Sequence, residues 1–241
     1  MLRLMFTRIA LLFVFFVIAK PMLSQIKEYY LTCDPNDFEM IYSKPFENIY
    51  IPVTVEYNGI IWQDCEMRIR GETTRYAPKK SLKIQFRGDA FANGKSTINL
   101  NADYLDKSYL HNFLSSRLYN LFGMNCYEVE HIRVYLNGDY LGLYVQIENM
   151  DEQFLNERNL SDKGNLYKAT NDGACLSIND DIPDNWEKKT NEGGGWEDIE
   201  KLRGDINSIP DNEFYDFVKN KFDYNNLVTV LALNMLLSNG S

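Results

Sequence analysis

The segment that decides the fold is RIRGETTRYAPKKSLKIQF, residues 68–86. Apolar and polar residues alternate at both of its ends, which is typical of β-strands. Between these ends, Gly71 to Lys80 form a loop with a glycine, two threonines and several basic residues. Free backbone amides, hydroxyls and basic side chains bind phosphate oxyanions, and a glycine lets the backbone approach them closely. The segment therefore predicts two strands joined by a phosphate-binding loop.

Lys83 lies on the second strand, Ser81 to Phe86. The three apolar residues of this strand share one face, so Lys83 projects from the other face with Ser81 and Gln85. A protein kinase carries its phosphate-binding lysine on a strand in this way, two residues beyond a small side chain. The alternative is a strand whose polar face is simply solvated, and local spacing alone favours that alternative.

Hairpin signals lie on both sides of this segment. Residues 47–57 alternate β-branched and aromatic side chains and lead into Asn58-Gly59, which is typical of a two-residue hairpin turn before a return strand over 60–70. A second such turn, Asn137-Gly138-Asp139, lies further along the chain. Downstream patterns predict a helix over residues 106–122, strands over 130–136 and 140–147, a short helix over 151–158 and a strand over 166–168.

The order of these elements is that of the N-terminal lobe of a protein kinase. We therefore expect an α+β, protein-kinase-like fold, with an antiparallel N-terminal sheet and one helix over residues 25–168. By this analogy residues 146–151 form the hinge that meets the adenine edge of a nucleotide, and Glu148 marks it. The alternative interpretation of Glu148 is a surface acid at a strand end.

The kinase analogy has one departure. The predicted helix over 106–122 contains no glutamate that could pair with Lys83. Glu66 or Glu148 can replace it only if folding brings one of them close. The chain also contains neither His-Arg-Asp nor Asp-Phe-Gly, so no catalytic residue is assigned. His111 and His131 are expected to be packing or surface histidines.

Beyond residue 168 the composition changes. Asn, Asp, Gly and Lys are frequent over residues 169–195, which predicts a long surface loop. Helical patterns follow over 196–207, 211–222 and 224–237, and the last of them is nearly apolar. Because only four residues follow that helix, residues 196–241 are expected to be the incomplete start of a helical C-terminal lobe.

The first 24 residues have the composition of a signal peptide, with Arg3 and Arg8 before or within an apolar run that ends at Ala19. That run is shorter than the ~20 residues of a membrane-spanning helix, although a membrane anchor is the alternative. We expect a secreted, cell-surface or periplasmic protein that is free of the membrane after cleavage. Removal of this segment deletes Arg3, Arg8 and Lys20, so the net charge changes from -9 to -12 (-9 minus 3). Such an acidic protein is not expected to bind nucleic acid.

The four cysteines, Cys33, Cys65, Cys126 and Cys175, have no CxxC spacing, so no metal site is predicted from them. They allow three disulfide pairings, among which the sequence does not choose. Cys65 alternates with Met67 and Ile69, and a buried free thiol is at least as good an interpretation of it.

Four segments in the same order resemble the CotH (spore coat protein H) family of secreted, atypical protein kinases. They are Arg70-Gly71-Glu72-Thr73-Thr74 with residues 78–86; Asn99-Leu100-Asn101-Ala102 with Asp106; residues 134–144 leading to Glu148; and Asn165-Leu166-Tyr167-Lys168. Each segment is weak by itself, and their combination over Met67 to Lys168 is specific. The apolar helix that ends near Asn239 is similar to the segment before that family's catalytic acids.

This resemblance implies an enzyme that uses ATP and a divalent metal, Mg or Mn, to phosphorylate Ser or Thr of a protein substrate. It implies that Lys83 contacts the phosphates, with Lys80 as the alternative, and that Glu148 marks the hinge. Arg70, Gly71, Thr73 and Thr74 would form the phosphate loop. The catalytic aspartates would follow residue 241, so this chain by itself is expected to be inactive. The alternatives are a non-catalytic exported module for binding or coat assembly and a glycan-binding protein. The oligomeric state stays open.

Overall fold

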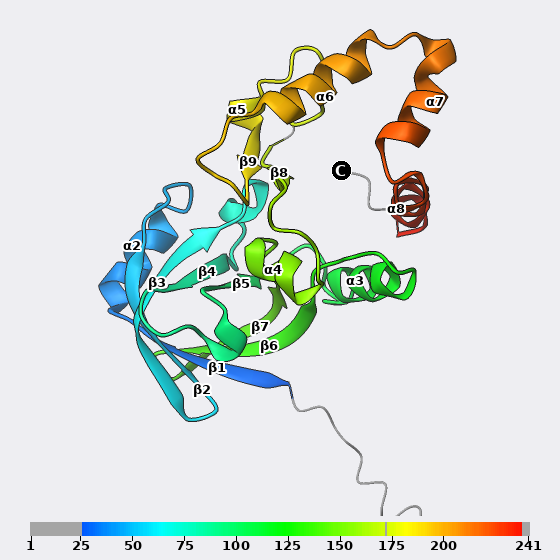
Figure 1. The fold of residues 1–241 in the computed structure, drawn as a ribbon. Helices are drawn as coiled ribbons and strands as arrows, with labels where there is room; N and C mark the ends of the chain where they lie inside the picture. Colours follow the sequence, from blue (N-terminus) through cyan, green and yellow to red (C-terminus); the bar gives the residue numbers. More distant parts are fainter. Residues whose placement is uncertain (1–25, 172, 238–241) are drawn as a thin grey trace, which may run out of the picture.

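The computed structural model describes residues 26–171 and 173–237, and a closed β-barrel forms its centre (Figure 1). The strands of the barrel are β1 (Lys27–Thr32), β2 (Ile51–Tyr57), β3 (Ile60–Arg70), β4 (Ser81–Phe86), β5 (Thr97–Asn101), β6 (Val129–Leu136) and β7 (Asp139–Ile147). Around the barrel they follow the order β1-β2-β3-β4-β5-β7-β6. The predicted signal peptide, residues 1–24, lies outside the described residues.

The barrel closes through a parallel pair, β1 and β6, whereas its other neighbouring strands are antiparallel. The structure is therefore α+β with one large mixed sheet, and the prediction of an antiparallel sheet is wrong at this closure. The cause is β1, which the predicted order of elements lacks. The prediction also lacks β5, because Ile98, Asn99 and Leu100 are buried in succession and give no alternating pattern.

The two faces of β4 divide as predicted. Leu82, Ile84 and Phe86 are buried in the core, where each such side chain contributes about 1.5–3 kcal/mol. Lys83 projects from the outer face and lies in register with Arg68 on β3 and with Asn99 on β5. The inside of the barrel is thus the hydrophobic core, and its outside carries the charged residues.

Three helices accompany the barrel: α2 (Pro35–Ser43), α3 (His111–Leu121) and α4 (Glu152–Glu157), with two short 3-10 helices, η1 (Thr73–Tyr76) and η2 (Ala92–Gly94). The helix predicted from residue 106 begins only at His111. Tyr109 has a φ of 57°, which a helix does not allow. The Asp106 carboxylate instead accepts hydrogen bonds from the amides of Ser108 (3.0 Å) and His111 (2.8 Å), which caps the turn before α3.

The C-terminal part consists of a small hairpin and four helices. Its elements are β8 (Tyr167–Ala169), α5 (Ile182–Asn185), β9 (Trp186–Lys188), α6 (Glu197–Ser208), α7 (Asp211–Lys221) and α8 (Tyr224–Leu237). The prediction of a surface loop over 169–195 is wrong at α5 and β9. This turn-rich segment folds around Asp180, whose buried carboxylate accepts hydrogen bonds from Trp186 Nε1 (3.0 Å) and Asn185 Nδ2 (2.8 Å).

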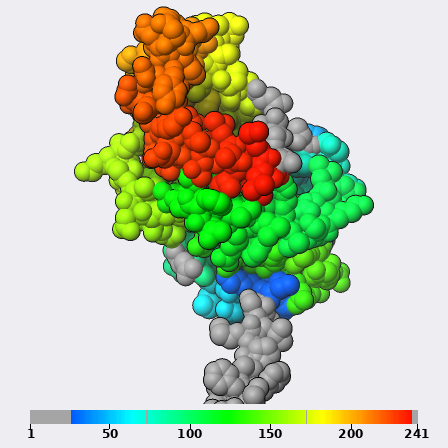
Figure 2. Space-filling model, turned by 90° about the vertical axis from the view of Figure 1, so that its right-hand side faces the viewer, coloured from blue at the N-terminus to red at the C-terminus, as the bar shows by residue number. Residues whose placement is uncertain are grey.

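Helix α8 lies across α3, as Figure 2 shows for the red and green segments. The hydroxyl of Tyr119 on α3 donates a hydrogen bond to Asn234 Oδ1 on α8 at 2.5 Å. This contact joins α8 to α3, one of the helices that accompany the barrel. Among the described residues, none of the helices has the length and apolar character that a membrane span requires.

Candidate functional site

Basic side chains gather on the outer face of the barrel, where β3 and β4 pair. Arg68 is the register partner of Lys83, and Arg70 is that of Ser81, so the three basic residues project from one face. The Arg70 guanidinium donates to Asn101 Oδ1 on β5. In the described part of the chain, Lys83 Nζ forms no hydrogen bond and no ion pair, so it is available to a ligand.

The β8–β9 hairpin brings further charges to this face, beside β3 and β4 (Figure 1). Lys168 on β8 is the register partner of Glu187 on β9, and Lys189 follows β9 directly. Lys189 Nζ donates to Glu187 Oε1 at 2.8 Å, and Lys168 Nζ lies 3.8 Å from Glu187 Oε2. The hairpin thus adds two lysines and one acid to the charges on the barrel.

Charged residues of the hairpin change the pKa of a lysine on the barrel. Burial lowers the pKa of Lys83, and the charges of Arg68 and Lys189 lower it further, whereas Glu187 raises it. Burial likewise lowers the pKa of Lys168, which Glu187 counteracts. Partly desolvated cations that repel one another gain most from a bound anion. We call Arg68, Arg70, Lys83, Lys168 and Lys189 the cationic site.

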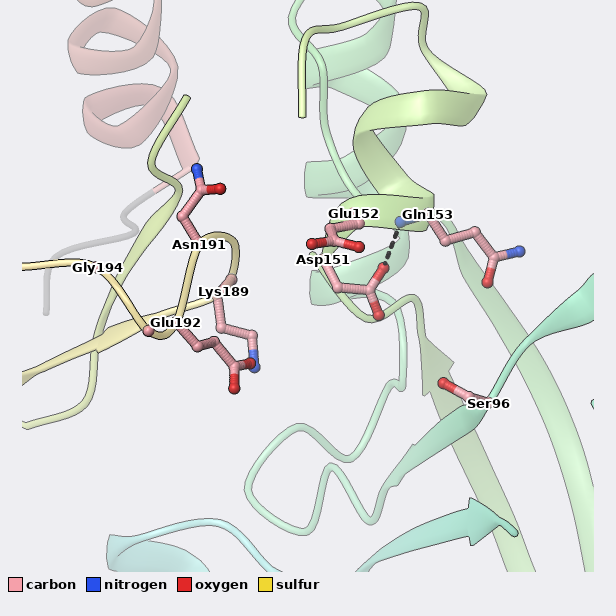
Figure 3. Close-up of a pocket in the computed structure, with 9 residues that line it drawn as sticks. Ser96, Asp151, Glu152, Gln153, Lys189, Asn191, Glu192 and Gly194 are labelled. Atoms are coloured by element: carbon pink, nitrogen blue, oxygen red, sulfur yellow. Dashed lines mark hydrogen bonds between the residues drawn. The ribbon is translucent and has the colours of Figure 1, made fainter. Parts of the chain in front are cut away.

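A cavity of about 830 Å³ opens next to the cationic site. Asp151 and Glu152, at the start of α4, lie opposite Lys189 and Asn191, with Ser96 at one end (Figure 3). Its size lies within the range of about 300–1,000 Å³ that is usual for small-molecule sites. Lys189 lines the cavity and is also part of the cationic site, so the cavity and the site are continuous. Asp151, the last residue of the predicted hinge, lies on the opposite wall of the cavity.

The loop over residues 71–80 is held by its own contacts. Gly71 has a φ of 102°, and a Cβ there would lie 3.0 Å from Thr74 Oγ1. Lys80 is 7% exposed, and its Nζ donates to the carbonyl of Arg75 at 2.5 Å. Lys80 therefore stabilises the loop from within and points away from the cationic site. Thr73 begins η1, and its side chain lies outside the described part of the structure.

Glu148 follows β7 and forms a buried ion pair. Its Oε2 lies 2.6 Å from Arg158 Nη2, and the same atom accepts the amide of Glu128 at 2.9 Å. Burial alone would raise the pKa of Glu148, but the hydrogen bonds from Arg158 and Glu128 outweigh it and hold the pKa below its ordinary value. The Glu148 side chain is therefore engaged within the protein, inside the segment predicted as the hinge, residues 146–151.

The structure thus brings Lys83 and Arg70 together, places the loop of Gly71 and Thr74 next to them, and separates Lys80 and Glu148 from them. Lys168 and Lys189 were not predicted as site residues. Lys168 could have been found from the sequence, because it belongs to the quoted segment 165–168. No sequence pattern points to Lys189, because it lies in the segment predicted to be a surface loop. In the segments that the structure describes, no group of three or more His, Cys, Asp or Glu could hold a metal ion.

Known proteins similar to this chain agree on one family. Residues 67–240 match the family described as "CotH kinase protein". The chain is also 28% identical, over 227 residues, to the inner spore coat protein H of Bacillus subtilis (strain 168). The alignment covers 90% of this chain and 61% of that relative, so the chain spans about three fifths of the relative's length. Because the family match extends over most of the chain and includes the whole cationic site, this protein belongs to the CotH kinase protein family.

Proposed function

We propose that this chain binds ATP and forms the nucleotide-binding part of a kinase that phosphorylates proteins. The observation that carries the proposal is the convergence of the cationic site with the cavity beside α4. A nucleotide has a polyanionic end and a base with hydrogen-bonding groups at its edge. The cationic site would contact the first, and the polar side chains that line the cavity would contact the second. The phosphates would contact Lys83, Lys168 and Lys189, and the base would lie toward Asp151.

The charges fit a triphosphate better than a single carboxylate. The cationic site has five basic groups, of which Lys83 lacks a protein partner in the described residues. Charge-assisted hydrogen bonds to phosphate are about twice as strong as neutral ones, and partial burial strengthens them. Phosphoryl transfer depends mainly on positioning and charge stabilisation, which is what these side chains supply.

Mg²⁺ or Mn²⁺ bound with ATP would neutralise the charge that develops on the transferred phosphate. No group of three or more His, Cys, Asp or Glu among the described residues could hold that ion, so no metal ligand and no catalytic residue is assigned. The ammonium groups of Lys83, Lys168 and Lys189 would donate hydrogen bonds to the phosphate oxygens of the nucleotide.

The name of the Bacillus subtilis relative, a spore coat protein, supports an association with a coat or surface. We infer that the protein is exported and that its substrates are proteins of such a layer, modified at Ser or Thr. A non-catalytic module for coat assembly is the alternative, and it would keep the fold without transferring phosphate.

Thermal unfolding with ATP and Mg²⁺ tests the proposal. A nucleotide at about one hundred times its Kd stabilises the folded protein by about 2.7 kcal/mol, so the wild type should melt several degrees higher. Lys83→Ala should lose most of this shift. Lys44→Ala is the matched control, because Lys44 is exposed and pairs only with Glu47 among the described residues, and it should keep the shift. No shift in the wild type would refute nucleotide binding.

A further inference from the structure

Glu187 is the acid that faces the cationic site. It lies on β9, in register with Lys168, and its two carboxylate oxygens are shared between Lys189 (2.8 Å) and Lys168 (3.8 Å). Its charge also favours the protonated form of Lys83 on the barrel. In return, Lys189, Lys168 and Lys83 hold the pKa of Glu187 below its ordinary value, although burial opposes them. Glu187 thus remains ionised among these cations.

The two glutamates that the sequence suggested as partners of Lys83 form ion pairs with other residues. Glu66 pairs with Arg87 at 2.6 Å, and Glu148 pairs with Arg158 at the same distance. Helix α3 contains no acidic residue at all. In protein kinases a helix glutamate pairs with the strand lysine. Among the described residues no acid pairs directly with Lys83, and Glu187 on the hairpin acts on it only through its charge.

We propose that Glu187 is the positioning residue of the phosphate site, holding Lys168 and Lys189 against β4 so that they act together with Lys83. The proposal rests on the proposed nucleotide binding. Without an acid, five basic groups in a partly buried site repel one another, and the hairpin lysines turn toward water. Glu187 offsets that repulsion. Because Glu187 bonds to Lys189, lies 3.8 Å from Lys168 and leaves Lys83 Nζ without a bond in the described residues, the phosphates have direct access to Lys83.

Two measurements on Glu187→Gln test this role, with Glu187→Asp as the conservative variant. Glu66→Gln is the matched control, since Glu66 is also a paired acid on the outer face of the barrel. The first measurement follows the titration of ¹³C-dimethylated Lys83 and Lys168 by NMR in the ligand-free protein. The second measures the Kd of ATP by calorimetry on unmodified protein between neutral and alkaline pH.

In Glu187→Gln, the titration midpoints of Lys83 and Lys168 should fall, because a favourable charge is lost, and the Kd of ATP should rise about tenfold. The weakening should begin at a lower pH than in the wild type, since these lysines lose their protons earlier. Glu187→Asp should restore most of the affinity, and Glu66→Gln should match the wild type in both measurements.

Unchanged lysine midpoints in Glu187→Gln would overturn the positioning role, whether or not nucleotide binds. Tighter ATP binding by Glu187→Gln would also overturn it, because Glu187 would then compete with the phosphates for the lysines. A wild type that binds no ATP refutes the proposed function separately. In that case the lysine titration alone decides whether Glu187 holds the hairpin lysines.

Discussion

Glu148 Oε2 lies 2.6 Å from Arg158 Nη2, and this buried pair joins the end of β7 to helix α4. Arg158 also donates to the carbonyl of Cys126 at 3.0 Å and lies over the ring of Phe154. One arginine therefore connects the strand end, the segment before β6 and the helix beside the cavity. One partner of this pair, Glu148, lies in the segment predicted as the hinge, residues 146–151.

We predict that Glu148→Gln lowers the free energy of unfolding by about 3–5 kcal/mol, because Arg158 is left as an uncompensated buried charge. Thermal and urea denaturation measure the loss. The control is Glu130→Gln, whose pair with Lys27 has the same 2.6 Å distance but is about 40% exposed on both sides. That change should cost less than about 1 kcal/mol. Equal losses in the two variants would contradict a special role of burial.

The same pair predicts a pH dependence of stability. Since the folded-state pKa of Glu148 is below its ordinary value, its contribution is present above the ordinary glutamate pKa and is lost as the pH falls through the folded value. Wild type should therefore lose stability faster than Glu148→Gln on acidification below about pH 4.3. Parallel curves for the two proteins, measured by urea denaturation, would show that Glu148 has no such shift.

The loop at the cationic site predicts a strict need for glycine at residue 71. Gly71→Ala should destabilise the protein by about 1–3 kcal/mol, because the φ of 102° is unfavourable for alanine and the new Cβ would meet Thr74 Oγ1 at 3.0 Å. Gly204→Ala is the control within α6. Gly204 is exposed, with free space around it, so alanine there should stabilise by about 0.5–1 kcal/mol. Differential scanning calorimetry distinguishes these opposite signs.

The parts of the fold that the sequence predicted are those in which one face is buried and the other solvated. Strands β3 and β4 have the predicted bounds because Met67, Ile69 and Leu82 alternate with charged residues. The alternation fails at β5, where Asn99 is buried between two apolar neighbours. Closure of the barrel by β1 and β6 depends on contacts between segments that are far apart in the chain, which local patterns do not encode.

The candidate site shows the same limit. Strand alternation places Arg70 and Lys83 on one face, and this was visible in the sequence. The inward turn of Lys80 depends on the conformation of the loop, and the pairing of Glu148 depends on α4. Lys189 reaches the site only because the β8–β9 hairpin folds against the barrel. Residues supplied by such tertiary packing have no local signature.

The cysteines give a last prediction, on chemical reactivity. All four are free thiols in the structure, and burial together with the charge of Asp64 raises the pKa of Cys65 to about 11. The thiolate is the reactive form, so Cys65 should resist iodoacetamide in the native protein, whereas the exposed Cys175 should react promptly. Mass spectrometry of peptides after timed alkylation measures both. In denaturant without reductant, all four should be alkylated. A smaller number would reveal a disulfide and contradict the free-thiol assignment, and Cys175→Ser identifies the rapidly reacting site.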